Sequence, residues 1–141
     1  MAAPDPNSVL STSTLPAVEV GFVSRSTALR DFLVEVFGLE PLPPIDLPIG
    51  VLYPLRCQGT ALKVFVPMSS PNAGPRTDSF FEVEGLRFLT IRVTDIAGVF
   101  ERAVAGGARI VRPPAEAIPG VWSGMMLDLD GNALEVSESR T

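Results

Sequence analysis

Histidine is absent from this sequence of 141 residues, and cysteine occurs once, at Cys57. The absence of histidine removes the commonest metal ligand and the side chain best suited to proton transfer near neutral pH. It also excludes Ser-His-Asp and Cys-His catalytic arrangements. A single cysteine excludes an intramolecular disulfide, so we expect a reduced thiol in a cytoplasmic protein. Chemistry would therefore depend on carboxylates, Lys63, arginines, Tyr53, the thiol or hydroxyl groups.

Long apolar runs are also missing. No stretch approaches the length needed to cross a membrane, and the beginning, MAAPDPNSVLSTSTLP, has neither the basic start nor the apolar core of a secretory signal. The formal net charge of −5 argues against nucleic acid as a partner and weakly favours a neutral or basic ligand. We therefore expect neither a nucleic acid nor a membrane partner.

Hydrophobic residues make up 46% of the chain and charged residues 19%. This balance is typical of a folded domain, and the length suffices for a genuine core. Proline- and serine-rich stretches divide the chain. We expect a flexible tail over residues 1–16, a first module over 17–67, a linker over 68–85 and a second module over 86–138, the modules together forming one domain.

In the first module, apolar spacing predicts the elements. VEVGFVS, residues 18–24, alternates as a strand does, and a helix is expected next, with Ser26 as its N-cap and Gly38 at its end. VLYPLRC and ALKVFVP then indicate two strands joined by a turn at Gln58-Gly59. The apolar positions of the helix are Leu29, Phe32, Leu33 and Val36.

The same order begins again after residue 85. LRFLTIRV is predicted to be a strand, and Asp95 to cap a helix that ends at Gly106-Gly107. Because this glycine pair ends a helix instead of opening one, it is no phosphate loop. ARIVR indicates a short strand, PPAEAIPG a loop, and VWSGMMLDL with NALEV a final hairpin. The apolar stripe of the helix is Ile96, Val99, Phe100, Ala103 and Val104.

The two modules correspond position by position. Glu19 in the first strand matches Phe88 at an offset of 69, and Phe32 in the first helix matches Phe100 at 68. A one-residue difference in the turn between strand and helix explains the two offsets. The sequence therefore predicts an α+β fold made of two βαβββ modules.

Two long stretches, RFLTIRVTDIAGVFERAVAGGARIVRPP and MLDLDGNALEV, resemble the second half of vicinal oxygen chelate proteins. That superfamily contains glyoxalase I, bleomycin-resistance proteins, extradiol dioxygenases and methylmalonyl-CoA epimerase. The closing motif is similar to its Asp-Pro-Asp-Gly-Asn-x-hydrophobic-Glu signature, with Leu129 in place of the proline. EVGFVSRSTALRDFLVEVFGLEPL is similar to the start of the first half. The resemblance covers residues 17–138 and implies a curved mixed sheet around a cleft, helices on the outside, and a homodimer.

In metal-using relatives, four cleft-facing positions supply the metal ligands. Glu19 and Glu135 match the first and the last of these positions, and Phe88 and Lys63 match the other two. Phenylalanine cannot coordinate a metal, and a protonated lysine repels a cation. The resemblance thus implies the scaffold without a tight divalent metal and without a cofactor, although two glutamates and water would hold a metal weakly.

The catalytic candidates implied by the resemblance are Glu135, Glu19 and Lys63. Burial raises the pKa of a carboxyl and a nearby ammonium lowers it, so this cluster would separate an acid from a base. The alternative is a charge-neutralising ion pair left in the old metal position. Ligand-lining candidates, each of which would otherwise be a core or surface residue, are Phe88, Arg92, Trp122, Met125 and Tyr53.

Two functions follow for a protein with a small-molecule ligand. The first hypothesis is a metal-independent lyase or isomerase that uses carboxylate acid–base chemistry on a small carbonyl-containing compound. The alternative is a non-catalytic protein that sequesters a drug or a metabolite, as bleomycin-resistance proteins do. Because one fold hosts both classes, the resemblance does not choose between them.

Overall fold

The computed structural model describes residues 15–74 and 82–140. Residues 1–14 of the predicted tail and residues 75–81 of the predicted linker lie outside this range. The chain divides into two compact units, one comprising the residues up to Val34 with Gly38–Pro71, and the other Glu35–Phe37 with the residues from Asn72 onward. Neither helix of the described residues is long and apolar enough to span a bilayer.

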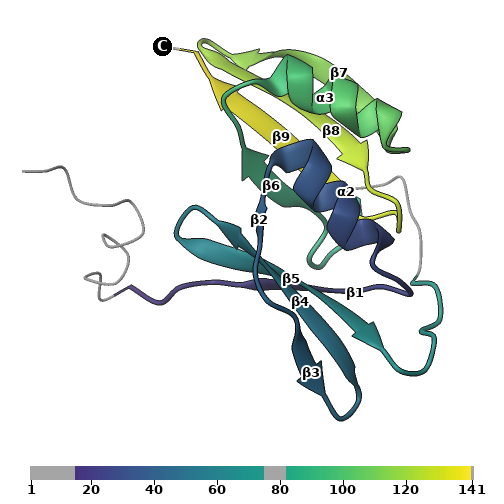
Figure 1. Cartoon of the computed structure of the whole chain (residues 1–141). Helices are drawn as coiled ribbons and strands as arrows, with labels where there is room; N and C mark the ends of the chain where they lie inside the picture. The colour runs from purple at the N-terminus through teal and green to yellow at the C-terminus, as the bar shows by residue number, and fades with distance from the viewer. Residues whose placement is uncertain (1–14, 75–81, 141) are drawn as a thin grey trace, which may run out of the picture. The chain divides into compact units, whose positions relative to one another are not determined.

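The first module forms a mixed sheet with one helix (Figure 1). Its strand order is β1-β5-β4-β2, and β3 also pairs with β4. β1 runs parallel to β5, and the other pairs are antiparallel. The elements are β1 (Val20–Val23), α2 (Ala28–Phe37), β2 (Glu40–Pro41), β3 (Ile45–Leu47), β4 (Gly50–Cys57) and β5 (Thr60–Pro67).

The second module repeats this arrangement. Its strand order is β6-β9-β8-β7, with β6 parallel to β9 and antiparallel pairs elsewhere. The predicted α+β class with two βαβββ modules is confirmed, and the second strand of the first module is split into β2 and β3. The elements are β6 (Leu89–Arg92), α3 (Ile96–Ala105), β7 (Arg109–Ile118), β8 (Val121–Leu127) and β9 (Ala133–Ser139).

The repeat holds at the level of strand register. Gly21 of β1 lies opposite Lys63 of β5, and Thr90 of β6 lies opposite Glu135 of β9. Lys63 and Glu135 are therefore equivalent positions in the two modules. Successive strand residues point to opposite faces, and the neighbours of both positions are buried: Leu62, Val64, Leu134 and Val136.

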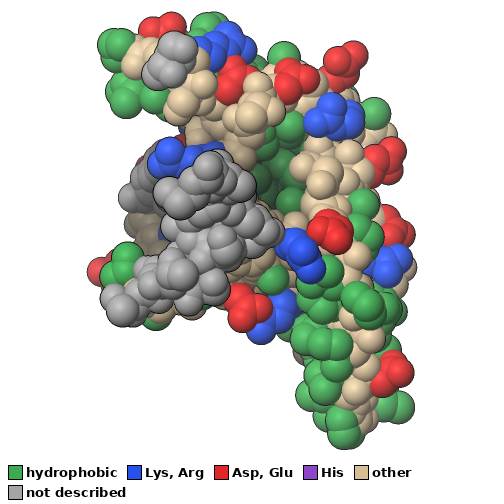
Figure 2. All heavy atoms as spheres, turned by 60° about the vertical axis from the view of Figure 1, so that its left-hand side comes forward, with side chains coloured by type: hydrophobic (Ala, Val, Ile, Leu, Met, Phe, Trp, Pro, Cys, Tyr) green, Lys and Arg blue, Asp and Glu red, His purple; other side chains and the backbone are tan. Residues whose placement is uncertain are grey.

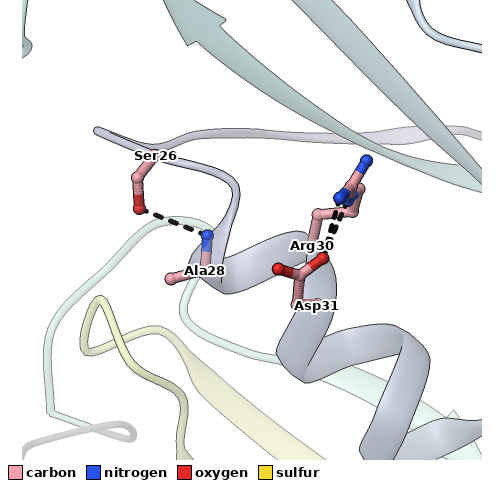
Figure 3. A network of polar contacts seen from close by, with 4 residues as sticks. All are labelled: Ser26, Ala28, Arg30 and Asp31. Carbon is pink, nitrogen blue, oxygen red and sulfur yellow. Dashed lines mark hydrogen bonds and ion pairs between the residues drawn. The ribbon is translucent and has the colours of Figure 1, made fainter.

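Both predicted helices are present, with small differences at their ends. Ser26 Oγ accepts a hydrogen bond from the Ala28 backbone N–H at 3.2 Å, but the N-cap position is Thr27, one residue later than predicted (Figure 3). Gly38 ends α2 in the left-handed conformation, with φ of 68°, as its lack of a side chain favours. Figure 3 also shows Arg30 paired with Asp31 on the first turn.

The second helix begins at the predicted cap. The Asp95 carboxylate accepts a hydrogen bond from the Gly98 N–H at 3.0 Å. Four of the five predicted stripe residues are buried, but Val104 is 57% exposed, so its prediction as a core residue is wrong. Val104 follows the buried Ala103 directly, and a step of about 100° around the helix carries it off the apolar stripe.

The segment predicted as the loop PPAEAIPG belongs to a strand. β7 continues through Pro113 and Pro114 to Ile118, with irregular register against β8. β7 is the edge strand of its sheet. Proline is tolerated at the edge and at bulges, because no N–H is needed there for the ladder. The loop prediction was therefore wrong, and the bulges decide which residues of β7 face which way.

The turn between β8 and β9 is organised by Asp128. Its Oδ1 accepts hydrogen bonds from the backbone N–H groups of Asp130 and Asn132, both at 2.9 Å, and the Asn132 amide donates to Oδ2 at 2.8 Å. Gly131 takes a φ of 84°. Burial raises the pKa of the Asp128 carboxyl, and the hydrogen bonds from Asn132 oppose that rise. The predicted turn is thus built around a buried carboxyl.

Apolar side chains are exposed around β3. Ile45 and Leu47 are 46% and 41% exposed, and Ile49 in the following turn is 66% exposed. Figure 2 shows apolar side chains gathered at the lower end of the molecule, where Figure 1 places β3. Charged side chains of both signs are interspersed elsewhere on that face. Contiguous apolar surface of this kind is typical of contact surfaces.

Glu138 links the last strand to the start of α3. Its Oε1 accepts a hydrogen bond from the Ile96 backbone N–H at 2.9 Å, and its Oε2 accepts one from Arg140. The Arg140 guanidinium lies 4.4 Å from the centre of the Trp122 ring. The N-terminus of a helix carries a partial positive charge, which favours a nearby carboxylate. Glu138 therefore gives the first N–H group of α3 an acceptor and offsets this partial charge.

Replacing Glu138 with glutamine is expected to lower the melting temperature near neutral pH. The hydrogen bond from Arg140, and then that from Ile96, hold the pKa of Glu138 below its usual value. A carboxyl whose pKa is lowered by folding stabilises the folded state at pH values above its pKa in the unfolded chain, about 4.3. This stabilisation is lost as the pH falls through the lower pKa of the folded state. Melting curves of the wild type and Glu138→Gln should therefore converge in acid. Glu101→Gln, on the exposed side of α3, is the control. A pH-independent gap would contradict the role of the charge.

Candidate functional site

Glu135 lies in the middle of β9, between Thr90 of β6 and Met125 of β8. Thr90 Oγ1 donates a hydrogen bond to Glu135 Oε1 at 2.9 Å. The Glu135 side chain is 28% exposed, whereas the flanking residues Leu134 and Val136 are fully buried on the other face. The strand thus holds this carboxylate in a fixed orientation, partly open to solvent.

Arg112 of β7 reaches the same carboxylate. Its Nη2 lies 3.9 Å from Glu135 Oε2 and donates a hydrogen bond to Ser123 Oγ at 3.1 Å. Arg112 and Glu135 are the two cross-strand neighbours of Met125, one on each side. The ion pair therefore passes over Met125, which is only 2% exposed.

Arg112 was not among the candidates from the sequence. PPAEAIPG was predicted to be a loop, so no register was assigned to the residue before it. The shift between Ile110 and Arg112 places Arg112, and not Val111, in the row of Met125 and Glu135. This bulge precedes the prolines, and no residue type in the sequence marks it.

The sheet face that carries Glu135, here called the Glu135 face, is rich in arginine. Among the described residues of the four strands, the register places three arginines and one carboxylate on it. The sign of this charge is opposite to that of the chain, whose net charge is −5. The polar residues of the face are Arg92, Arg109, Arg112, Glu135, Thr90, Ser123, Ser137 and Ser139.

In the first module, Lys63 is paired with Glu19. Lys63 Nζ lies 3.6 Å from Glu19 Oε1, and both side chains are partly exposed. Lys63 follows the buried Leu62 and precedes the buried Val64, so it lies on the other face of the sheet. Two of the three catalytic candidates are therefore joined in one ion pair, and Glu135 belongs to the other module.

The ligand-lining candidates are divided between faces. Strand alternation places Phe88, which is 39% exposed, and Arg92 on the Glu135 face with Met125. Trp122 lies opposite Glu138, which binds the start of α3, and so occupies the helix-covered face. Tyr53 lies opposite the buried Val64, and Arg30 of α2 covers its ring at 4.8 Å.

The positions that resemble metal ligands do not fit a divalent ion. Glu19 faces the Lys63 ammonium, and Glu135 faces the Arg112 guanidinium and accepts a hydrogen bond from Thr90. Each module thus offers one carboxylate that is already paired with a cation, and divalent metals need several anionic or neutral donors. Within residues 15–74 and 82–140, no group of three or more metal-binding side chains is placed to hold an ion.

Comparison with known proteins gives one family. Residues 21–136 match the model of the Glyoxalase/Bleomycin resistance protein/Dioxygenase superfamily. The search of curated proteins gave no match.

Several solved structures share the fold. TioX from Micromonospora sp. ML1 is 27% identical, with a TM-score of 0.59 over 86% of this chain and 95% of that one. A glyoxalase family protein from Bacillus cereus is 14% identical, with a TM-score of 0.76 over 92% and 97%. A mutant of the fosfomycin resistance protein FosX from Listeria monocytogenes, complexed with Mn(II) and 1S,2S-dihydroxypropylphosphonic acid, is 13% identical, with a TM-score of 0.67 over 88% and 92%.

Proposed function

Because the chain belongs to the glyoxalase/bleomycin resistance protein/dioxygenase superfamily, we propose that it binds a small molecule on the Glu135 face and releases it unchanged. The observation that carries this proposal is the pairing of Glu135. One carboxylate oxygen accepts a hydrogen bond from Thr90, and the other faces Arg112. A carboxylate held in this way serves better as part of a binding surface than as a base.

The physical reason lies in what proton transfer requires. A general base needs a carboxylate whose proton affinity matches its task and whose oxygen reaches the substrate. Both oxygens of Glu135 already have partners, the Thr90 hydroxyl and the Arg112 guanidinium, so neither is free to meet a substrate proton without leaving its partner. In the first module the Glu19 carboxylate is likewise occupied by its ion pair with Lys63. Hydrogen bonding to a ligand, in contrast, is well served by such pairs.

The family and one relative indicate the kind of ligand. The superfamily name includes bleomycin resistance proteins, and FosX is a fosfomycin resistance protein. A drug or a metabolite that is sequestered is therefore the ligand class we propose, with no metal or other cofactor. The expected homodimer stays part of this proposal on the resemblance, and the cytoplasmic location on the single cysteine.

A second candidate is the metal-independent lyase or isomerase. It is favoured by the partial exposure of Glu135 and by its fixed orientation on a strand. In this mechanism Glu135 would move a proton next to a carbonyl group, and Glu19 and Lys63 would assist. The carboxylate would have to leave Arg112 to act.

The two candidates are separated by the fate of a bound compound. A thermal-shift screen of metabolites and antibiotics is expected to give hits, and mass spectrometry should recover each hit unchanged after long incubation. The same incubation with Glu135→Gln should give the same result. Glu116→Gln, on the other face of the sheet opposite Trp122, is the charge-matched control.

Turnover by the wild type would contradict sequestration. If that turnover fell by ~10²–10⁴-fold in Glu135→Gln and not in Glu116→Gln, Glu135 would be the acid–base group. If no compound in the screen bound to the protein, both candidate functions would be contradicted.

A further inference from the structure

The charge of the Glu135 face specifies the ligand further than the family does. We propose, as an extension of the binding function above, that the ligand carries an anionic group, a carboxylate or a phosphonate, which binds to Arg112. Arg92, Arg109 and Arg112 lie on this face with one carboxylate, Glu135, among the described strand residues. A local excess of cations attracts an anion even on a protein of negative net charge.

Arg112 is the residue placed to bind the anion. A guanidinium offers five N–H donors in a planar fork that matches two oxygens of a carboxylate or phosphonate. Its Nη2 is held by Ser123 Oγ at 3.1 Å, while the distance to Glu135 Oε2 is 3.9 Å. The contact with Glu135 is thus the looser of the two. An anionic ligand would replace Glu135 while Ser123 keeps the guanidinium in place.

Arg92 lies on the same face, on β6 at the opposite edge of the sheet from Arg112. It lies opposite Ser137 of β9, and Ser137 lies opposite Ser123 of β8. Arg92, Ser137 and Ser123 therefore form one row across the sheet. The last of them, Ser123, accepts the hydrogen bond from Arg112. An anion in this row would receive donors from both arginines and from Ser137, whereas Ser123 is buried and accepts the hydrogen bond from Arg112.

Met125, beneath the ion pair of Arg112 and Glu135, indicates that the ligand also has an apolar part. Met125 is covered where Arg112 reaches across β8 to Glu135. It forms a small apolar cluster with Ala133 and Leu127 on the same face. An anionic group that replaces Glu135 as the partner of Arg112 would place the rest of the ligand next to this cluster, and methionine adapts well to flat or irregular shapes. The ligand class is therefore an acid with an adjacent apolar body.

The test compares probes of the same shape and different charge. Benzoate and phenylphosphonate are titrated against the neutral benzamide, and dissociation constants are taken from amide chemical shifts of the intact chain. We expect both anions to bind about tenfold more tightly than benzamide, the size of one charge-assisted hydrogen bond. The shifts should centre on β7, β8 and β9.

Two variants should act in opposite directions. Arg112→Gln removes the guanidinium and should weaken benzoate about tenfold. Glu135→Gln removes the competing carboxylate and should strengthen benzoate about threefold, as expected for the loss of a partly exposed ion pair. Arg56→Gln, in the first module where Arg56 pairs with Glu40, removes the same charge and should leave binding unchanged.

Several results would overturn the inference. Equal affinity for benzoate and benzamide, unchanged binding in Arg112→Gln, or weaker binding in Glu135→Gln would each exclude Arg112 as an anion site. If neutral compounds from the library bind to this face as tightly as the acids, the binding function stands and the anionic ligand class fails. If neither probes nor library compounds bind, the proposed function itself fails.

Discussion

Replacing Asp128 with alanine is expected to lower the free energy of unfolding by about 3 kcal/mol and the melting temperature by about 10 °C. The carboxyl is 5% exposed and accepts hydrogen bonds from two backbone N–H groups and from the Asn132 amide. Alanine leaves these donors without an acceptor in a buried place, where each unsatisfied group is costly. Chemical denaturation followed by circular dichroism measures the change.

The control for Asp128 lies two residues away in the same turn. Asp130→Ala removes an exposed carboxylate but keeps the backbone N–H that Asp128 binds. It should change the free energy of unfolding by less than about 0.5 kcal/mol. Equal losses in the two variants would show that the turn responds to charge alone and not to the hydrogen bonds of Asp128.

The second large effect is expected at Gly124 of β8. A Cβ at this position would lie 2.6 Å from Phe100 Cζ of α3 and 2.9 Å from the Arg112 backbone oxygen. Both neighbours are fixed, one in the core under a helix and the other in the backbone of β7. Gly124→Ala is therefore expected to cost about 2 kcal/mol, as overpacking of a tight interior does.

The variant also reports on the site. Because Gly124 allows β7 to approach at Arg112, alanine should displace Arg112 and weaken benzoate binding together with stability. Gly21→Ala is the matched control, since the structure leaves open space around its Cβ position. Melting temperatures and benzoate titrations of both variants test this. A Gly124→Ala protein as stable as the wild type would contradict the tight packing.

Simple periodicities predicted much of the fold. The alternation of apolar and polar residues in NALEV predicts that Leu134 and Val136 share one face and Glu135 lies on the other, and the burial of the three residues agrees. The match of the two modules anticipated their common register, which pairs Lys63 with Gly21 and Glu135 with Thr90. These features depend on local spacing, and local spacing is visible in one sequence.

Positions that depend on pairing were harder to predict. Alternation along β8 sends Trp122 and Met125 to opposite faces, but which of these faces the helix covers depends on the pairing of Trp122 with Glu138 of β9. Arg112 depends on a bulge in β7, which requires knowledge of the partner strand. The ion pairs of Glu135 and Glu19 depend on contacts between separate strands and could not be read from composition.

The pairing of first and last strands in each module has a kinetic consequence. The hairpins β4–β5 and β8–β9 join neighbours in the chain and can form early, whereas β1 must wait for β5, and β6 for β9. Until each parallel pair closes, the edges of β5 and β9 are open to strands of other nascent chains. Exchange of first strands between copies is therefore the misassembly that this topology invites during synthesis.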